Sequence, residues 1–496
     1  MSDINKFIKD KKVLVVGLGI LGGGVSACLW LLKHKAKLTI TDLKQKKDLE
    51  KSLKRLKKYS SKIKLVLGKH NKNDFKNNDI IVVNQGVPVK NNPYLKIANK
   101  ANKLIENEMS LFFRFNKNPV IGITGSWGKT TTTNWIGRLL RGKYDDVIAG
   151  GNTPDNPVLS FLDKLKPNIP VVLEIPSCEL ELLEANYKAP KIAIITNLYR
   201  NHLNRHGNMK NYACAKANIF QNQKHTDYLI LNYDNKWTKF FLSLKPQSQV
   251  YFVSHYPLPK SKNGIFNKKG KIYFQENKNK ELVFDANKFI KQWGEHNLDN
   301  LMTAILAAKL FGLTLAQIKK QISSLPQVKF RQEIIFQNKK LIIVNDSSAT
   351  SPDSTIAALK RFTLLNTRSA NSTGFTRQKN TNLILITGGT DKNLKYNELA
   401  KTIKKDILPK NLVILNGSAS KKLVKELNRI KYSNKYFVFE SLEECFCYSL
   451  YQRKQKKRNI ILFSPAATSF EKFKNEFDRA EQFNKLSLSI NSTGSF

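Results

Sequence analysis

Cysteine and methionine are scarce in this 496-residue sequence, and long apolar runs are missing. None of the five cysteines has the paired spacing of a metal site, and their odd number is not typical of a disulfide framework, so we expect reduced thiols in the cytoplasm. The first 12 residues are polar, and no stretch of 18 consecutive apolar residues occurs. The sequence therefore predicts neither a signal peptide nor a membrane-spanning helix.

Acidic residues are also few, 38 against 84 lysines and arginines, which leaves a formal charge of +46. Such a charge ordinarily indicates a polyanionic partner such as nucleic acid. The excess is spread evenly, however, because residues 1–110, 111–327 and 328–496 carry +15, +15 and +16. A nucleic-acid-binding face concentrates its charge, so we favour solvated surfaces that reflect a compositional bias. Polyanion binding is the alternative.

The length exceeds what one hydrophobic core supports and indicates about three domains. Short β-branched runs alternate with helical patterns along the chain, which predicts an α/β fold. We place the domains at residues 1–111, 112–327 and 328–496. We expect the first and last to be Rossmann-like and the middle one to be a P-loop ATPase.

The middle domain opens with VIGITGSWGKTTTTNWIGR, residues 120–138. This pattern predicts a buried strand, a glycine-rich turn and a helix from Thr131, an arrangement whose N–H groups and helix dipole favour phosphate. Lys129 would reach the β- and γ-phosphates, and the Thr130 hydroxyl would bind Mg²⁺. Ile123 stands where the general P-loop has glycine, so only the shorter T-G-x-x-G-K-T form matches. We expect ATP here; the alternative is a glycine-rich turn with an incidental lysine. The predicted ATP-loop residues are Gly125, Ser126, Trp127, Gly128, Lys129, Thr130 and Thr131.

A second glycine turn follows the first predicted strand of the chain. Gly17, Gly19 and Gly22 fit G-x-G-x-x-G, and Asp42 ends the next strand where a ribose-binding acid is found in dinucleotide-binding folds. The pattern alone indicates only a phosphate-bearing ligand. NAD and a nucleotide-sugar are both compatible with it.

Three further side chains are candidates for the middle domain's chemistry. Glu174 ends an apolar strand, where an α/β ATPase places a metal ligand, although an edge glutamate in solvent gives the same pattern. His202 follows another buried strand and either binds metal or caps a loop. Lys216 lies on a predicted helix, where a lysine is ordinarily solvated.

Polar residues also follow predicted strands in the last third of the chain. The strands near 341–345, 383–387, 412–415 and 460–463 each lead into a polar or glycine-rich turn, which is where open α/β sheets bind ligands. Before them, Asn297 and Asn300 have amide groups suited to an adenine edge, although asparagines also cap helices.

Taken in order, these turns resemble those of the Mur ligase family over about Val13 to Phe483. T-G-S-W-G-K-T is similar to the family's ATP loop, and G-N at 151–152 matches its next turn. E-I-P-S-C-E-L around Glu174 resembles E-x-S-S-F-Q-L, and N-H-L-N-R-H-G around His202 resembles D-H-L-D-R-H. Lys216 lies in A-K-x-x-I, the position that this family carbamylates.

The resemblance implies an ATP- and Mg²⁺-dependent amide ligase and assigns roles residue by residue. It implies catalytic roles for Lys129, His202 and Lys216, and Mg²⁺ ligands at Thr130, Glu174, His202 and carbamylated Lys216. Further ATP contacts are implied at Asn297, Asn300, Arg331 and Asp346. Substrate contacts are implied at Gly17, Leu18, Gly19, Asp42, Asn152, Thr350, Lys392 and Ser469, with a uridine diphosphate on the first glycine turn.

The G-L-G-x-x-G turn and the Gln85-Gly86-Val87-Pro88 turn favour the D-glutamate-adding member of the family. That member implies UDP-N-acetylmuramoyl-L-alanine and D-glutamate as substrates, and we expect a cytoplasmic monomer without membrane insertion. Trp127, Asn201, Asn204, Ser348 and Glu476 differ from the usual family residues. The alternatives are a ligase with another acceptor, a non-catalytic or polyanion-binding protein on this fold, and a dinucleotide-dependent oxidoreductase.

Overall fold

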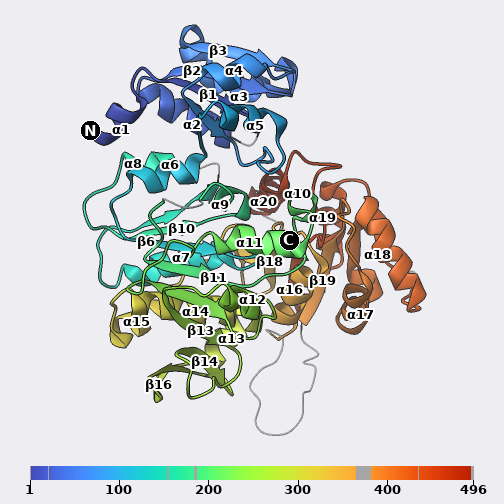
Figure 1. Cartoon of the computed structure of the whole chain (residues 1–496). Coiled ribbons are helices and arrows are strands. Elements are labelled where there is room, and N and C mark those ends of the chain that lie inside the picture. The colour runs from blue at the N-terminus through green and yellow to red at the C-terminus, as the bar shows by residue number, and fades with distance from the viewer. Residues whose placement is uncertain are drawn as a thin grey trace. The chain divides into compact units, whose positions relative to one another are not determined.

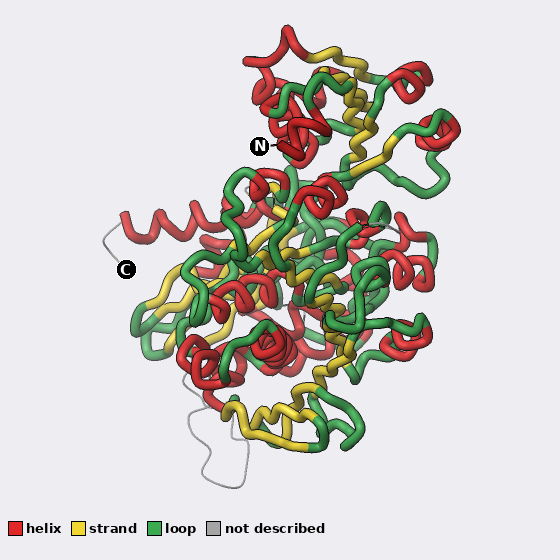
Figure 2. The backbone as a smooth tube through the Cα atoms, turned by 60° about the vertical axis from the view of Figure 1, so that its left-hand side comes forward, coloured by secondary structure: helices red, strands yellow, loops and turns green. Residues whose placement is uncertain are grey.

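We analysed a computed structural model, which describes residues 2–20, 22–153, 156–183, 187–364, 381–433 and 435–492. Within these residues the strands form three large sheets and a two-stranded ribbon, in agreement with the predicted α/β class (Figures 1 and 2). The chain divides into two compact units. The first comprises Met1–Phe284 and Asp299–Leu325, and the second comprises Asp285–Leu298 and Pro326–Phe496.

The first sheet is parallel throughout, with strand order β3-β2-β1-β4-β5. Its central strand β1 and the neighbouring β4 are almost fully buried, as expected when helices cover both faces. Its strands are β1 Lys12–Val16, β2 Lys37–Asp42, β3 Ile63–Leu67, β4 Ile80–Val83 and β5 Leu104–Glu106. The helices of this part are α1 Ser2–Ile8, α2 Gly23–Lys33, α3 Glu50–Leu56, α4 Lys72–Asn77 and α5 Pro93–Lys100.

The first and second sheets share one apolar core. Helix α6 (Glu108–Phe115) buries Phe112 and Phe113 in the same cluster as Trp30 of α2 and Phe161 of α8 (Leu159–Leu162). The domain boundary predicted at 111/112 falls inside α6. The exact limits of the domains therefore stay predictions.

The second sheet has the order β16-β15-β14-β13-β12-β11-β6-β10-β7 and is parallel from β14 to β7. Strands β14 and β15 pair antiparallel, next to the edge strand β16. The strands are β6 Val120–Thr124, β7 Ile148–Gly150, β10 Val171–Glu174, β11 Ile192–Ile195, β12 Tyr228–Asn232, β13 Gln249–Ser254, β14 Gly264–Lys268, β15 Lys271–Glu276 and β16 Asn279–Asp285. The main helices are α7 Lys129–Leu140, α9 Ser177–Leu180, α10 Leu203–His206, α11 Met209–Ala217, α12 Thr238–Ser243, α14 Leu298–Leu310 and α15 Leu315–Ile322, and the ribbon is β8 Asn152–Thr153 with β9 Asn156–Pro157.

The third sheet belongs to the second unit and has the order β17-β18-β22-β19-β20-β21. Only β17 is antiparallel to its neighbour, and apolar clusters cover both faces. The strands are β17 Glu333–Gln337, β18 Leu341–Asn345, β19 Thr381–Thr387, β20 Leu412–Leu415, β21 Phe437–Phe439 and β22 Arg458–Phe463. The helices are α16 Pro352–Leu364, α17 Asn397–Asp406, α18 Ser418–Arg429, α19 Leu442–Tyr451 and α20 Glu476–Ser492.

Residues 285–298, which the sequence analysis assigns to the middle domain, group with the second compact unit through α13 (Asn287–Trp293). The Arg361 Nε on α16 donates to the Gln292 carbonyl at 3.0 Å, and its guanidinium lies over the Trp293 ring at 5.6 Å. A buried arginine needs such partners for its charge. They lie as far as 69 residues away in the chain, so a local sequence pattern does not reveal them.

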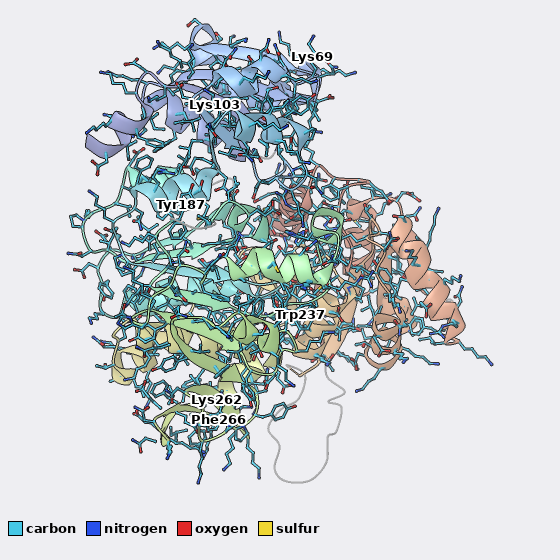
Figure 3. The ribbon with its side chains drawn as sticks, viewed as in Figure 1. Lys69, Lys103, Tyr187, Trp237, Lys262 and Phe266 are labelled. Atoms are coloured by element: carbon cyan, nitrogen blue, oxygen red, sulfur yellow. The ribbon has the colours of Figure 1, made fainter. Side chains whose placement is uncertain are left out.

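None of the described helices combines the length and the apolar character needed to cross a membrane. The lysines labelled in Figure 3, Lys69, Lys103 and Lys262, come from three separate segments of the first unit. The positive charge is thus not confined to one element.

Candidate active site

The glycine-rich turn between β6 and α7 is held in a conformation that only glycine adopts without strain. Gly125 and Gly128 have φ of +149° and +83°. An added Cβ would lie 1.9 Å from the Thr196 Oγ1 at Gly125, and 2.3 Å from the Asn300 Oδ1 at Gly128. Helix α7 begins at Lys129, two residues earlier than predicted, because Gly128 is the left-handed N-cap residue. The turn thus presents backbone N–H groups and a helix N-terminus, as a phosphate site requires.

Residues that follow the neighbouring strand β11 fix the turn at Trp127. Thr196 Oγ1 donates to the Trp127 carbonyl at 2.7 Å, and the Trp127 N–H donates to Asn197 Oδ1 at 2.9 Å. The Trp127 ring stacks on Tyr199, with 4.5 Å between the ring centroids. Sequence reasoning missed these residues. The signal that could have identified them is their position directly after an apolar strand, which in the structure pairs with β6.

Lys129, Thr130 and Glu174 come together beside the turn. Glu174 is the last residue of β10 and pairs in register with Ile123 of β6. The Thr130 hydroxyl donates to Glu174 Oε2 at 2.7 Å, and Lys129 Nζ lies 3.9 Å from Glu174 Oε1. A hydroxyl and a carboxylate are oxygen donors of the kind that Mg²⁺ prefers, so these two residues fit the ion. No group of three His, Cys, Asp or Glu side chains suited to a metal occurs in the described part of the chain.

Lys216 is not the solvated lysine that its helical position suggests. Its side chain is buried, and Nζ donates to the Gly125 carbonyl at 2.9 Å and to Thr124 Oγ1 at 3.1 Å. Burial, and secondarily the charge of Lys129, holds the pKa of Lys216 well below its ordinary value. Its surroundings therefore favour the neutral form of the amine.

The two histidines of the 202–206 segment have different surroundings. His202 is exposed and is the N-cap residue of α10, with φ of 52°. Its ring centroid lies 6.0 Å from that of Tyr212, the ring over which Lys216 Nζ lies at 4.7 Å. His206 is buried and shares a 3.0 Å hydrogen bond with Ser177 Oγ. His202, which faces solvent near Lys216, is thus the histidine placed to meet a ligand.

The first glycine turn brings its four predicted residues together, but Asp42 is already engaged. Its Oδ2 accepts from the Gly19 N–H at 3.0 Å, and its Oδ1 accepts from the Lys44 N–H at 2.9 Å. Leu18 is fully buried, backbone included. The carboxylate shapes the turn, and a ribose contact would share its remaining lone pairs. Asn152 lies in β8, but its side chain is outside the described residues.

The two predicted adenine residues have separate local partners. Asn300 Oδ1 accepts from the Thr132 hydroxyl at 3.2 Å, in addition to its close approach to Gly128. Asn297 Nδ2 donates to the Trp293 carbonyl at 2.8 Å. Asn300 therefore lies directly at the phosphate loop, whereas Asn297 belongs to the segment that packs in the second unit.

In the second unit, Asp346 follows β18 and is buried. It accepts hydrogen bonds from the Gln332 N–H at 3.0 Å and the Ser464 hydroxyl at 2.7 Å. Burial raises the pKa of Asp346 to about 7, although both hydrogen bonds oppose the shift. Arg331, a predicted ATP contact, is exposed beside Gln332 and lowers this pKa by its charge.

The predicted amino-acid-binding residues lie on turns of the third sheet. Ser469 is buried, and its hydroxyl has no hydrogen-bond partner within the described residues. Thr350 is half-buried and Lys392 is exposed. Arg479 of α20, which sequence reasoning missed because a helical arginine usually looks solvated, is fully buried and donates to the carbonyls of Ser347, Ala467 and Thr468. It fixes the backbone on which Ser469 stands.

Comparison with known proteins gives consistent results. A profile of the Mur ligase middle domain matches residues 123–308, and one of the Mur ligase MurD-like N-terminal domain matches residues 11–106. The UDP-N-acetylmuramoylalanine–D-glutamate ligases of Borreliella afzelii and a Roseiflexus species are 36% and 33% identical to this chain, and each match covers 97% of this chain and 98% of the relative.

Solved structures share the fold. The UDP-N-acetylmuramate–alanine ligase of Thermotoga maritima superposes with a TM-score of 0.59 at 18% identity, over 97% of this chain and 100% of that one. The MurF ligase of Thermotoga maritima, solved in complex with ADP, gives 0.56 at 15% identity, over 98% of each chain. Together with the near full-length relatives, these findings show that the chain belongs to the Mur ligase family.

Proposed function

We propose that this chain is an ATP-dependent ligase that adds D-glutamate to UDP-N-acetylmuramoyl-L-alanine in peptidoglycan precursor synthesis. Relatives with that named activity match it over nearly its full length. The observation that supports ATP chemistry most directly is the close approach of Lys129, Thr130 and Glu174. They meet beside a glycine turn that tolerates no side chain.

The reaction we propose begins with attack of the substrate carboxylate on the γ-phosphate of ATP, which breaks the bond to the β-phosphate and releases ADP. The resulting acyl phosphate is attacked by the amine of the amino acid, an amide forms, and phosphate leaves. Lys129 lies where its ammonium would offset the charge that develops on the transferred phosphoryl group. When bound, Mg²⁺ would add positive charge there; Thr130, Glu174, His202 and carbamylated Lys216 would hold it.

Lys216 meets the chemical requirement for carbamylation. Only a neutral amine has the lone pair that attacks carbon dioxide, and the burial that lowers the pKa of Lys216 favours that form. The product is an anion whose single N–H could still donate to one of the two acceptors that Nζ now contacts, the Gly125 carbonyl and Thr124 Oγ1, while its oxygens can only accept hydrogen bonds or bind a metal ion. Carbamylation would thus convert the buried amine of Lys216 into an anionic oxygen ligand.

The acceptor site we propose uses Lys392 for one carboxylate of D-glutamate and the hydroxyls of Thr350 and Ser469 for the other. The unpartnered, buried hydroxyl of Ser469 supports this, because such a group costs free energy unless a ligand completes it. Ser348 stands where the family has lysine. One lost charge-assisted hydrogen bond is worth roughly 1.5–3 kcal/mol, so the half-saturation concentration for D-glutamate should be about ten- to a hundredfold higher than with lysine there.

The test is ATP-dependent phosphate release by the purified protein with UDP-N-acetylmuramoyl-L-alanine and a panel of D- and L-amino acids. We expect turnover with D-glutamate, and loss of most of it in Lys129→Ala. Turnover only with a different amino acid would overturn the assignment of D-glutamate as the acceptor but leave the assignment of ligase activity intact. Near-normal activity of Lys129→Ala would overturn the ATP site.

A further inference from the structure

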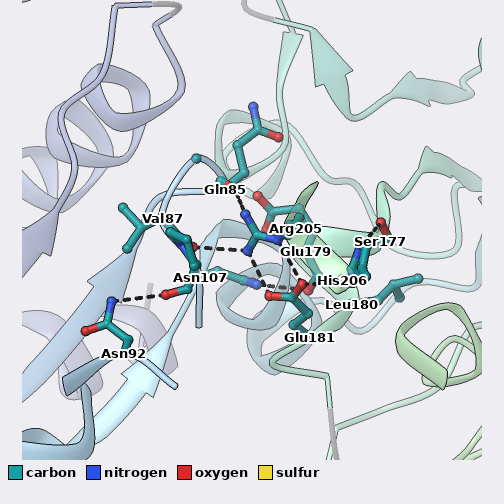
Figure 4. Close-up of polar contacts among 12 residues, drawn as sticks. Gln85, Val87, Asn92, Asn107, Ser177, Glu179, Leu180, Glu181, Arg205 and His206 are labelled. Atoms are coloured by element: carbon teal, nitrogen blue, oxygen red, sulfur yellow. Dashed lines mark hydrogen bonds and ion pairs between the residues drawn. The ribbon is translucent and has the colours of Figure 1, made fainter. Parts of the chain in front are cut away.

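Arg205 makes four hydrogen bonds that the ligase chemistry does not use. Its Nε and Nη2 donate to the two carboxylate oxygens of Glu181, each at 2.8 Å. Its Nη1 donates to the Gln85 carbonyl at 2.6 Å, and Nη2 donates also to the Val87 carbonyl at 3.0 Å. All three nitrogens of the guanidinium are therefore occupied (Figure 4). Burial is the largest influence and disfavours the charge, but the hydrogen bonds to Glu181, together with the negative charges nearby, outweigh it and raise the pKa of Arg205.

The turn that Arg205 holds lies directly against the first glycine turn. The Val87 side chain approaches so closely that a Cβ added to Gly17 would lie 2.8 Å from Val87 Cγ2. Asn84, which begins the turn, accepts from the Gly86 N–H at 3.0 Å through its Oδ1. A Cβ added to Gly24, at the start of α2, would lie 2.8 Å from Asn84 Nδ2. The 84–87 turn thus packs directly against the first glycine turn. Its position therefore sets how much space a ligand has beside that glycine turn.

The other end of Arg205 is fixed to the catalytic part of the second sheet. Helix α10 begins immediately after His202, the exposed histidine near Lys216. Glu181 follows α9 directly and also lies 3.5 Å from His206 Nδ1. The side chain of Glu181 therefore holds the guanidinium of this α10 residue, and the backbone of the 84–87 turn accepts its remaining hydrogen bonds (Figure 4).

We infer that Arg205 is a positioning residue for the nucleoside diphosphate part of the substrate: it holds the 84–87 turn against the first glycine turn and ties it to the helix that follows His202. This inference rests on the proposed function, because it takes that glycine turn as the uridine diphosphate site. The diphosphate would then lie at a fixed place relative to His202.

The chemistry of the contact requires arginine rather than any cation. A planar guanidinium meets one carboxylate with two parallel bonds while its remaining N–H groups reach two carbonyls. A lysine in its place has one nitrogen and cannot span Glu181 and both carbonyls. Arg205→Lys keeps the charge, so it isolates the loss of geometry. We expect the KM for the uridine nucleotide to rise about tenfold, the scale of one lost charge-assisted hydrogen bond. The KM for ATP should stay within about twofold, since the phosphate loop has other supports.

A matched control exists in the same unit. Arg114 also forms an ion pair with a buried glutamate, donating from Nε to Glu106 Oε1 at 2.9 Å, but it contacts Tyr187 rather than the 84–87 turn. Arg114→Lys makes the same chemical change and should leave both KM values unaltered. Equal effects of the two substitutions on the nucleotide KM would mean that any lost ion pair has this result, and would overturn the inference.

A double substitution tests the route through the turn. Val87→Ala loosens the contact with Gly17 and should itself raise the nucleotide KM. In the Arg205→Lys background it should add little, because the turn is already released; a full multiplication of the two effects would refute a shared route. If Arg205→Lys does not fold, Glu181→Gln replaces it as the test, because it removes the charge that holds the guanidinium. It should likewise raise the KM for the uridine nucleotide and leave the KM for ATP nearly unchanged. A wild-type protein inactive with the uridine nucleotide would defeat the proposed function, whereas an active Arg205→Lys with unchanged KM would defeat this inference alone.

Discussion

Gly125→Ala is the smallest change that tests the geometry of the phosphate loop. The new methyl group would be placed 1.9 Å from Thr196 Oγ1, and its backbone would have to keep φ at +149°. That backbone region costs a residue with a side chain about 1–3 kcal/mol. Displacing the Thr196 hydroxyl from the Trp127 carbonyl costs about 1 kcal/mol more.

The total is roughly 2–4 kcal/mol, which corresponds to a rise of about 30- to 1000-fold in the KM for ATP if the loop distorts and the fold persists. The control is Gly207→Ala, where φ is also positive, at +76°, but nothing lies within 4 Å of the added Cβ. It therefore carries backbone strain without a clash. We expect it to lower the melting temperature slightly and to change the KM for ATP far less. The assays are thermal unfolding and ATP-dependent phosphate release.

The clash itself can be relieved by a second substitution. In Thr196→Ala the hydroxyl is gone, and the next atoms near the new methyl are the Thr196 Cβ at 3.2 Å and the Asn197 nitrogen at 3.3 Å. Gly125→Ala should therefore cost less in that background than in the wild type. If the two substitutions multiply, or if Gly125→Ala behaves like Gly207→Ala, the reasoning about this loop is wrong.

Two further predictions concern titratable groups. Labelled bicarbonate should give a carbamate carbon signal in the wild-type NMR spectrum that disappears in Lys216→Ala; a wild-type spectrum without it would contradict carbamylation. Burial, and secondarily the charge of Glu179, raises the pKa of Glu108 to about 8. The folded protein therefore keeps a proton that the unfolded chain releases, and stability from this group is lost as the pH rises from about 4.5 to about 8. Glu108→Gln should raise the melting temperature by a few degrees more at pH 8 than at pH 5; an equal change at both would exclude this linkage.

The sequence by itself determined the local elements of the active site. The β-branched run 120–124, the glycines at 125 and 128 and the lysine after them predicted a strand, a turn and a helix, and the structure has all three. Glu174 was predicted at a strand end and lies at the end of β10. These features follow from periodicity, turn chemistry and the side-chain preferences of neighbouring residues, so a short window of sequence contains them.

Only the tertiary structure decided the features that depend on residues far apart in the chain. Lys216 looks solvated in its own helix and is buried only because the phosphate loop lies over it, more than 90 residues away in sequence. The carboxylate of Asp42 is used by Gly19, and Arg361 of α16 is buried against the carbonyl of Gln292, 69 residues earlier in the chain. Arg205 acquires its partners in the 84–87 turn by the same means. Burial and hydrogen bonding are properties of the assembled core, and a local pattern cannot state which distant atoms will satisfy a buried charge.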